Sequence, residues 1–233
     1  MGDSVMTSII AIANIAGGTH KTTAAHSLSV ATVEYGKKVL LIDLDPRADL
    51  TFNVGFERSR ETIAEMLQGS SLAQSNDITT DERFDFIGAD SRLTALNDVN
   101  SLKTFLNGVP NHYDVIIIDT PSQIDPRIAM AFSAADSIVI PSDSSIHSIR
   151  GALNTSKIQS NAKKFILPIN QLSAEHTKHF SDAIVLDALI PVSEGIDAAI
   201  AQKRSVLSAD KNSDFAQAYR EAAYSLLEHL KFF

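Results

Sequence analysis

The sequence contains no cysteine, no low-complexity segment and no long apolar run. Without cysteine the chain cannot form disulfides, thiolate zinc sites or iron–sulfur clusters, and this composition fits a cytoplasmic protein. No apolar segment approaches the roughly 20 residues that a membrane-spanning helix needs, and the acidic start Met1–Ser4 does not resemble a signal peptide. The net charge of −8 argues against a protein that coats nucleic acid broadly, although it is compatible with a local basic face.

Strand-like and helix-like segments alternate along the 233 residues, as expected for one α/β domain spanning residues 1–233. Uninterrupted apolar runs such as Val115–Ile118 are typical of parallel strands that helices cover on both faces. The pattern therefore predicts a doubly wound, mostly parallel sheet with right-handed crossovers and helices on both faces. We expect strands at Ser8–Asn14, Lys38–Asp43, Phe84–Ile87, Asp114–Asp119, Ser137–Pro141, Lys164–Ile169 and Ile184–Pro191. We expect helices near residues 21–35, 60–68, 90–107, 125–134, 145–160, 174–180 and 194–203.

A final amphipathic helix is indicated by apolar residues at three- and four-residue spacing between Phe215 and Leu230. A helix that lies on a membrane surface would need a basic polar face. The polar face of this helix is mixed to acidic, so we expect it to pack on the sheet. The polar segment 69–83 is expected to form a surface loop.

A candidate phosphate loop follows the first predicted strand and leads into the first predicted helix. Backbone N–H groups of such a turn point at anions, and the helix dipole favours negative charge there. Lys21 would reach the terminal phosphates and the Thr22 hydroxyl would ligate Mg²⁺. The match to G-x-x-x-x-G-K-[ST] is imperfect, because Ile15 and His20 stand where that pattern has glycine. The residues assigned to phosphate binding are Gly17, Gly18, Thr19, His20, Lys21, Thr22 and Thr23.

Aspartates end two further predicted strands, at the sheet edge where open parallel sheets bind ligands. Asp43 and Asp45 end the second strand, and Asp119 ends the apolar strand 115–118. Asp119 would hold Mg²⁺ next to the Thr22 hydroxyl, and Asp43 would support the metal shell. Asp45 would orient or activate the water that attacks a γ-phosphate. The alternative, that these are strand-exit aspartates, is weakened because all three accompany a phosphate loop.

At these positions the chain resembles the ParA/MinD family of deviant Walker A ATPases, and within it the ParA-like partition and positioning ATPases. The family loop K-G-G-x-G-K-T-T stands here as AGGTHKTT over residues 16–23. The switch D-x-D-P-Q stands as DLDPR over residues 43–47, and the Walker B motif D-T/C-P-P as DTPS over residues 119–122. The resemblance covers nearly the whole chain. It implies a P-loop NTPase with ATP or ADP and Mg²⁺ as cofactors, in which Asn170 and Pro191 flank the adenine.

Two departures from the family pattern affect the loop. Ala16 replaces the signature lysine, which in the family reaches the phosphates of the partner subunit across a nucleotide-sandwich dimer. His20 replaces a glycine, which costs about 1–2 kcal/mol if the turn needs a positive φ, although histidine tolerates such angles better than most residues. Our hypothesis is that another cation replaces the lysine, with Lys157 assigned a catalytic role and Arg150 as the second candidate.

The resemblance also implies partners. A ParA-like protein would form a homodimer with ATP, bind nucleoid DNA non-specifically and respond to a small ParB-like or cargo-bound adaptor protein. DNA binding needs basic side chains that meet phosphates, and the candidates here are Lys203, Arg204 and Lys164. The protein would then be cytoplasmic and nucleoid-associated, without a membrane partner.

Four functions are compatible with these motifs. The favoured one is an ATPase that positions a plasmid, a chromosome or a protein body. A MinD-like membrane regulator is disfavoured because the last helix lacks a basic face. A nucleotide-gated binding module with little hydrolysis would fit Ala16 and His20. A small-molecule phosphotransferase, as in dethiobiotin synthetase, is disfavoured by the Asp-x-Asp-Pro switch. Nitrogenase-type iron proteins are excluded because the chain has no cysteine.

Overall fold

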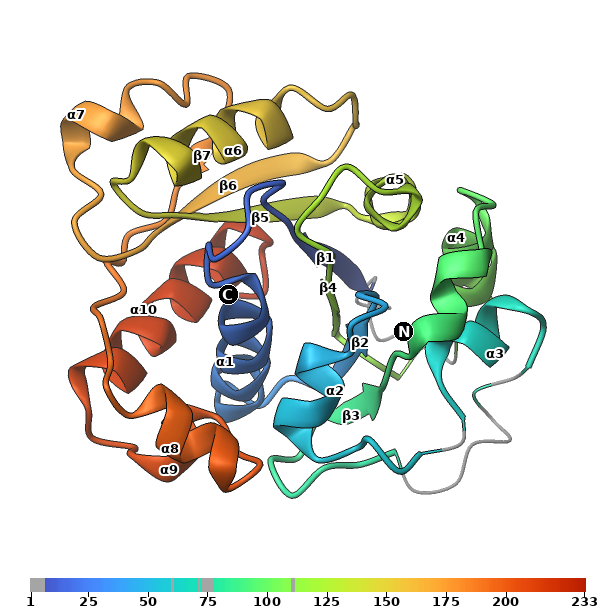
Figure 1. Cartoon of the computed structure of the whole chain (residues 1–233). Helices are drawn as coiled ribbons and strands as arrows, with labels where there is room; N and C mark the ends of the chain where they lie inside the picture. The colour runs from blue at the N-terminus through green and yellow to red at the C-terminus, as the bar shows by residue number, and fades with distance from the viewer. Residues whose placement is uncertain (1–6, 60, 71, 73–77, 110–111) are drawn as a thin grey trace.

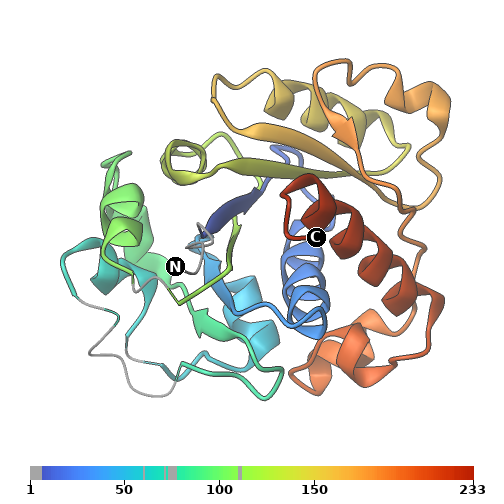
Figure 2. The same cartoon turned by 180° about the vertical axis from the view of Figure 1, so that it is seen from behind.

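A parallel β-sheet forms the centre of the computed structural model, which describes residues 7–59, 61–70, 72, 78–109 and 112–233 (Figures 1 and 2). Within these residues the sheet has seven strands in the order β3-β2-β4-β1-β5-β6-β7, and every pair of neighbouring strands is parallel. The predicted doubly wound parallel sheet is therefore confirmed. The strands are β1 Ser8–Ile12, β2 Val39–Asp43, β3 Asp85–Ile87, β4 Val115–Asp119, β5 Ser137–Ser142, β6 Lys163–Pro168 and β7 Ile184–Val185.

The two faces of the sheet bury two separate apolar cores, since successive side chains of a strand point to opposite faces. One core holds Leu28, Phe165 and Tyr219, and the other holds Ile118 and Met130. The first is covered by α1 Lys21–Glu34, α2 Asp49–Val54, α8 Ile196–Ala201, α9 Val206–Ala209 and α10 Asp214–His229. The second is covered by α3 Ile63–Leu67, η2 Ser91–Ala95, α4 Ser101–Asn107, α5 Pro126–Ala134 and α6 Ile146–Ser156. The short helix α7 Ala174–Thr177 follows β6 and has no buried residue.

The last helix, α10, lies against α1, as the red and blue helices of Figure 1 show. Its apolar residues Tyr219, Ala222 and Leu226 are buried in the first core. The expectation that this helix packs on the sheet is confirmed, because its buried residues share the first core with strand residues such as Phe165. No helix in the described part of the chain is both long enough and apolar enough to span a membrane.

Several predicted boundaries differ from the structure. The predicted helix 90–107 is divided into η2 and α4, because Asp98 accepts a hydrogen bond from the Asn100 N–H and so begins a new turn. The short helices α2 and α9 were not predicted, since fewer than two turns show no clear apolar period. The expected strand Ile184–Pro191 shrinks to β7. Part of the predicted loop 69–83 lies outside the described residues.

The fold places the predicted motifs at one edge of the sheet. Residue pairing puts Ile12 of β1 beside Asp119 of β4, and Asp119 beside Asp43 of β2. The carboxyl ends of these three central strands therefore meet where the loop after β1 enters α1. This is the edge at which open parallel sheets bind ligands.

Candidate functional site

The phosphate loop joins β1 to α1 and uses the left-handed backbone conformation twice. Gly18 has φ 70°, and His20, the residue before the first turn of α1, has φ 62° and ψ 23°. The turn therefore needs a positive φ at His20, which is the condition under which we expect backbone strain. A residue with a side chain occupies a position that favours glycine. The His20 side chain is exposed, makes no capping hydrogen bond and lines the cavity beside the loop.

Helix α6 supports the loop from the side. The buried Asn14 side chain donates to Pro141 O at 2.9 Å and accepts from Ala16 N at 3.0 Å. The Thr155 hydroxyl accepts from Ile15 N at 3.0 Å. Gly151 of α6 lies so close to Ala16 that a Cβ atom added to the glycine would come within 2.4 Å of the alanine Cβ. The start of the loop is therefore fixed by hydrogen bonds and by close packing.

Lys21 is buried and folded back onto the loop. Its Nζ donates to Ala16 O at 2.9 Å and to Thr19 Oγ1 at 3.4 Å. Burial lowers the pKa of Lys21 to about 8, with the Asp119 carboxylate opposing this shift and the Arg47 guanidinium adding to it. An anion beside Nζ would offset the cost of burying this ammonium group, as expected of a phosphate-binding lysine.

Asp119 carries a buried oxygen that has no partner. Its Oδ1 makes no hydrogen bond with any described residue. Burial raises the pKa of Asp119 well above its usual range, Asp43 raises it further, and the hydroxyl of Thr22 and the ammonium of Lys21 act in the opposite direction. A buried acceptor without a donor is costly, and a cation or its bound water would satisfy it. Asp119 and Thr22 therefore fit Mg²⁺, which is held by few protein oxygens together with phosphate oxygens.

Asp43 is fully buried behind the site, and both of its oxygens accept hydrogen bonds from the protein. Oδ1 accepts from Asp45 N at 3.0 Å, and Oδ2 accepts from Thr51 N at 3.0 Å and from Thr51 Oγ1 at 2.7 Å. Burial raises the pKa of Asp43 to about 7 in spite of these bonds. The geometry indicates that Asp43 fixes the turn after β2 to α2. Its role in the metal shell stays a prediction.

Asp45 forms an ion pair with Arg47 at the rim of the site. The Arg47 Nη2 atom lies 2.9 Å from Asp45 Oδ2, and Nε lies 3.2 Å from the same oxygen. Arg47 Nη2 also lies 3.4 Å from Ser122 Oγ and 3.5 Å from Asp49 Oδ2. The catalytic candidate Asp45 is thus held by a cation that contacts both the β2 and β4 strand ends.

A cavity of about 390 Å³ opens over the loop and is lined by Lys21, Thr22 and Arg47, whereas Asp43, Asp45 and Asp119 lie outside its lining. Its volume lies in the range of small-molecule sites, and its walls combine backbone of the glycine turn with two basic side chains, Lys21 and Arg47. The lining residues are Gly17, Gly18, Thr19, His20, Lys21, Thr22, Thr23, Arg47, Asp49, Ser122 and Gln123.

Several known proteins resemble this chain in sequence and in fold. A family model described as an AAA domain matches residues 7–171. The sporulation initiation inhibitor protein Soj of Bacillus subtilis is 29% identical over 248 residues, which cover 94% of this chain and 97% of Soj. The chromosome partitioning protein ParA of Caulobacter vibrioides is 28% identical over 250 residues, which cover 94% of this chain and 93% of that protein. The chain belongs to the ParA/MinD family of P-loop ATPases.

A solved member of the ParA/MinD family agrees with this chain in fold. The septum site-determining protein MinD of Pyrococcus horikoshii, complexed with Mg-ADP, matches with a TM-score of 0.82 at 22% identity, over 97% of this chain and 98% of MinD. That MinD structure contains Mg-ADP. The residues predicted to hold the adenine, Asn170 and Pro191, lie side by side after β6, where Asn170 N donates to Ile190 O at 2.7 Å.

The cations predicted to serve the dimer and DNA have different surroundings. Arg150 and Lys157 are exposed on α6, and Arg150 is the neighbour of Gly151, which packs on the phosphate loop. Lys203 lies over the Phe52 ring, donates to Phe52 O at 2.7 Å and pairs with Glu57 at 3.2 Å. It therefore fastens the turn between α8 and α9 to α2.

Lys164 is likewise used inside the protein, where its Nζ donates to Ser156 O and Ile158 O at the end of α6. Of the three predicted DNA residues, only Arg204 is exposed and free of ion pairs within the described part of the chain. The turn between α8 and α9 and strand β6 lie at opposite ends of both views in Figures 1 and 2. The predicted residues therefore do not form one continuous basic patch.

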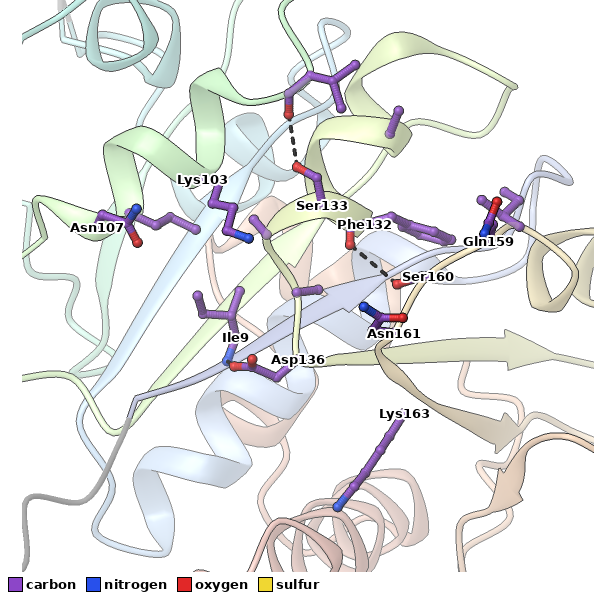
Figure 3. A pocket seen from close by; sticks show the side chains of 16 residues that line it. Ile9, Lys103, Asn107, Phe132, Ser133, Asp136, Gln159, Ser160, Asn161 and Lys163 are labelled. Carbon is purple, nitrogen blue, oxygen red and sulfur yellow. Dashed lines mark hydrogen bonds between the residues drawn. The ribbon is translucent and has the colours of Figure 1, made fainter.

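A larger cavity, of about 850 Å³, lies at the opposite edge of the sheet (Figure 3). Its walls include Ile9, Lys103, Asp136 and Asn161, near the amino ends of the strands. The Asp136 carboxylate is already used, since it accepts a hydrogen bond from Ile9 N at 2.9 Å. Ligands of open parallel sheets bind at the carboxyl ends of the strands, so the smaller cavity over the phosphate loop is the candidate site.

Two features of the site were not anticipated from the sequence. The sequence has Arg47 where the family switch has glutamine. The pairing of Arg47 with Asp45 depends on the conformation of the turn after β2, which the sequence does not give. Gly151 gave no signal of its own, because its role comes from the approach of α6 to the loop.

Proposed function

We propose that this chain is an ATP-switched positioning ATPase. ATP and Mg²⁺ bind at the loop Gly17–Thr23, two subunits close over two nucleotides, and the dimer holds DNA non-specifically. A small adaptor protein on the cargo, which is a plasmid, a chromosome or a protein body, stimulates slow hydrolysis. The name of the chromosome partitioning protein ParA supports a role in partitioning or a related process.

One observation carries this proposal: the unpartnered Asp119 oxygen stands at a strand end beside a phosphate loop. When bound, Mg²⁺ would neutralise charge on the β- and γ-phosphates. Thr22 and Asp119 would hold it, and the backbone N–H groups of the loop with Lys21 would cradle the phosphates. Asp45, held by Arg47, would orient the attacking water, and Asp43 would keep the turn that presents Asp45.

Exposed apolar side chains near the cavity support the dimer. Ile124 is 86% exposed and follows Gln123, which lines the cavity, and Ile146 is 77% exposed at the start of α6. We infer that the partner subunit covers these two isoleucines. A closed dimer would bury them and would remove water from the phosphates, which strengthens electrostatic interactions there.

The proposal is tested by measuring mass in solution and binding of random-sequence DNA, with and without ATP and Mg²⁺. We expect an ATP-dependent dimer whose DNA binding weakens steeply with salt. Asp45→Ala should keep nucleotide binding, trap the dimer and abolish turnover. Asp49→Ala is the matched control, because Asp49 lines the same cavity and also faces Arg47. A chain that stays monomeric with ATP contradicts the proposal, and normal turnover by Asp45→Ala contradicts the role of Asp45.

A second candidate is a nucleotide-gated binding module with little or no hydrolysis. Ala16 favours it, because an apolar residue stands where a cation would stabilise the transferred phosphoryl group. The lifetime of the ATP-bound dimer distinguishes the two candidates. Asp45→Ala should trap the dimer of an ATPase, but it should leave the lifetime of the dimer unchanged in a binding module.

A further inference from the structure

Arg47 is fixed at the wall of the phosphate cavity although its side chain is 61% exposed. Its Nε and Nη2 atoms form a fork on the Asp45 carboxylate, and Nη2 also donates to Ser122 Oγ. Asp45 follows β2 and Ser122 follows β4, so the guanidinium is anchored to two strand ends at once. A planar guanidinium held in this way loses little further entropy when it forms another hydrogen bond.

One end of this guanidinium is still available. A guanidinium carries five N–H donors, of which Nε contributes one and each terminal nitrogen two. The Nε and Nη2 donors are directed at Asp45 and Ser122. Across the described residues Nη1 of Arg47 makes no hydrogen bond. Arg47 can therefore hold Asp45 and still donate to a second anion.

The space that Arg47 faces is the one that Lys21 faces. Both residues line the 390 Å³ cavity. Burial is the main reason that the pKa of Lys21 falls to about 8, and the charge of Arg47 lowers that pKa further. Two cations that repel each other across a cavity are stabilised together when an anion binds between them. Such a pair favours the ligand with the greater negative charge.

We propose that Arg47 contacts the terminal phosphate of a bound nucleoside triphosphate from within the same subunit, and that it supplies the positive charge that Ala16 lacks. Nη1 would donate to a γ-phosphate oxygen while Nε and Nη2 keep Asp45 in place. The residue would thus make the site prefer a triphosphate over a diphosphate and would couple that preference to the position of Asp45. This inference rests on the proposed nucleotide site, and it differs from the hypothesis that Lys157 or Arg150 reaches over from the partner.

The test measures binding of ADP and of a non-hydrolysable ATP analogue, each with Mg²⁺, by calorimetry. Arg47→Gln should weaken binding of the triphosphate analogue by about 10- to 100-fold, the range for one charged hydrogen bond. Binding of ADP should change by less than about threefold. Arg47→Lys, which keeps the charge but not the fork, should be intermediate. Because the contact lies within one subunit, these ratios should not depend on protein concentration.

Arg58→Gln is the matched control, since it removes one exposed arginine that does not line the cavity. It should leave the preference for triphosphate over diphosphate unchanged. Equal loss of both ligands in Arg47→Gln, or no loss, overturns the inference and leaves the proposed function intact. A wild-type chain that binds neither nucleotide overturns both.

Discussion

Gly151 of α6 leaves no room for a side chain, and we expect Gly151→Ala to loosen the phosphate loop. A Cβ atom at this position would lie 2.3 Å from Asn14 Oδ1, 2.4 Å from Ala16 Cβ and 2.9 Å from Ala16 N. The Cβ and N atoms of Ala16 have no side-chain torsion that could move them away, and Asn14 Oδ1 is held in place by its hydrogen bond from Ala16 N. Either α6 or the start of the loop has to move by roughly 1 Å.

The expected cost is the difference between two opposing effects. Overpacking of this kind costs about 1–3 kcal/mol, and contacts near 2.3 Å place this substitution at the upper end. Replacing a glycine inside a helix by alanine returns about 1 kcal/mol through helix propensity. The net loss is about 2 kcal/mol, which for a chain of this length lowers the unfolding midpoint by about 4–8 °C. Because Asn14 and Ala16 belong to the loop, nucleotide binding should weaken as well.

Thermal unfolding and calorimetric binding of ADP with Mg²⁺ test this expectation. The matched control is Gly108→Ala, because Gly108 also has helical backbone angles and its nearest neighbour would lie 3.4 Å away, an ordinary contact. The control should unfold within about 2 °C of wild type and bind ADP equally well. A Gly151→Ala chain as stable as wild type would refute the claim that α6 is packed against the loop at this point.

Two further predictions concern the backbone of the loop and a buried ion pair. His20→Gly should raise the free energy of unfolding by roughly 0.5–1 kcal/mol, because φ 62° is strained for a residue with a side chain. The gain from removing this strain is reduced by the greater entropy of glycine in the unfolded state. Chemical denaturation checks this, and His20→Ala should give no such gain. Glu82 is buried, which by itself would raise its pKa, but hydrogen bonds from His26 and Ser205 lower the pKa from 4.5 to about 2. This depressed pKa stabilises the fold above pH 4.5 by up to about 3 kcal/mol and the stabilisation is lost as the pH falls towards 2. The stability difference between wild type and Glu82→Gln in urea should therefore shrink between pH 6 and pH 3, and a constant difference would contradict the assignment.

The layered fold could be predicted because its signals are local. The central strands are continuous apolar runs. Residues 115–118 are all buried, which requires that helices cover both faces of the sheet. Strand order and the pairing of Asp43 with Asp119 follow from long-range contacts that no local pattern contains. The division of the predicted helix 90–107 depended on one Asx turn at Asp98, a side-chain effect that apolar periodicity does not register.

The candidate site was predictable in its backbone and less so in its side chains. The motif order predicts that the phosphate loop and the aspartates lie at the carboxyl ends of parallel strands, but not which strands are neighbours. The positive φ at His20 entered the prediction only as a condition, and the structure meets it with φ 62°. The partners of individual charges do not, because they depend on distances between distant segments. Lys203 is the clearest case: its sequence context indicated a surface cation, but its ammonium pairs with Glu57 and lies over the Phe52 ring.

The same arrangement explains why Ala16 and Gly151 belong together. Ala16 is 4% exposed, and its side chain faces α6 rather than the phosphate cavity. The side chain of a lysine at this position would meet Gly151 of α6. The hydrogen bonds of Asn14 and Thr155 hold the backbone of the loop there. The aliphatic part of the lysine would be buried there and would displace α6, even if the ammonium group reached solvent. The tight packing of the loop is therefore compatible with alanine and not with a cation at this position. The proposed phosphate contact of Arg47 would add a positive charge beside Lys21 without disturbing this packing, because Arg47 pairs with Asp45 and lines the cavity from the end of β2.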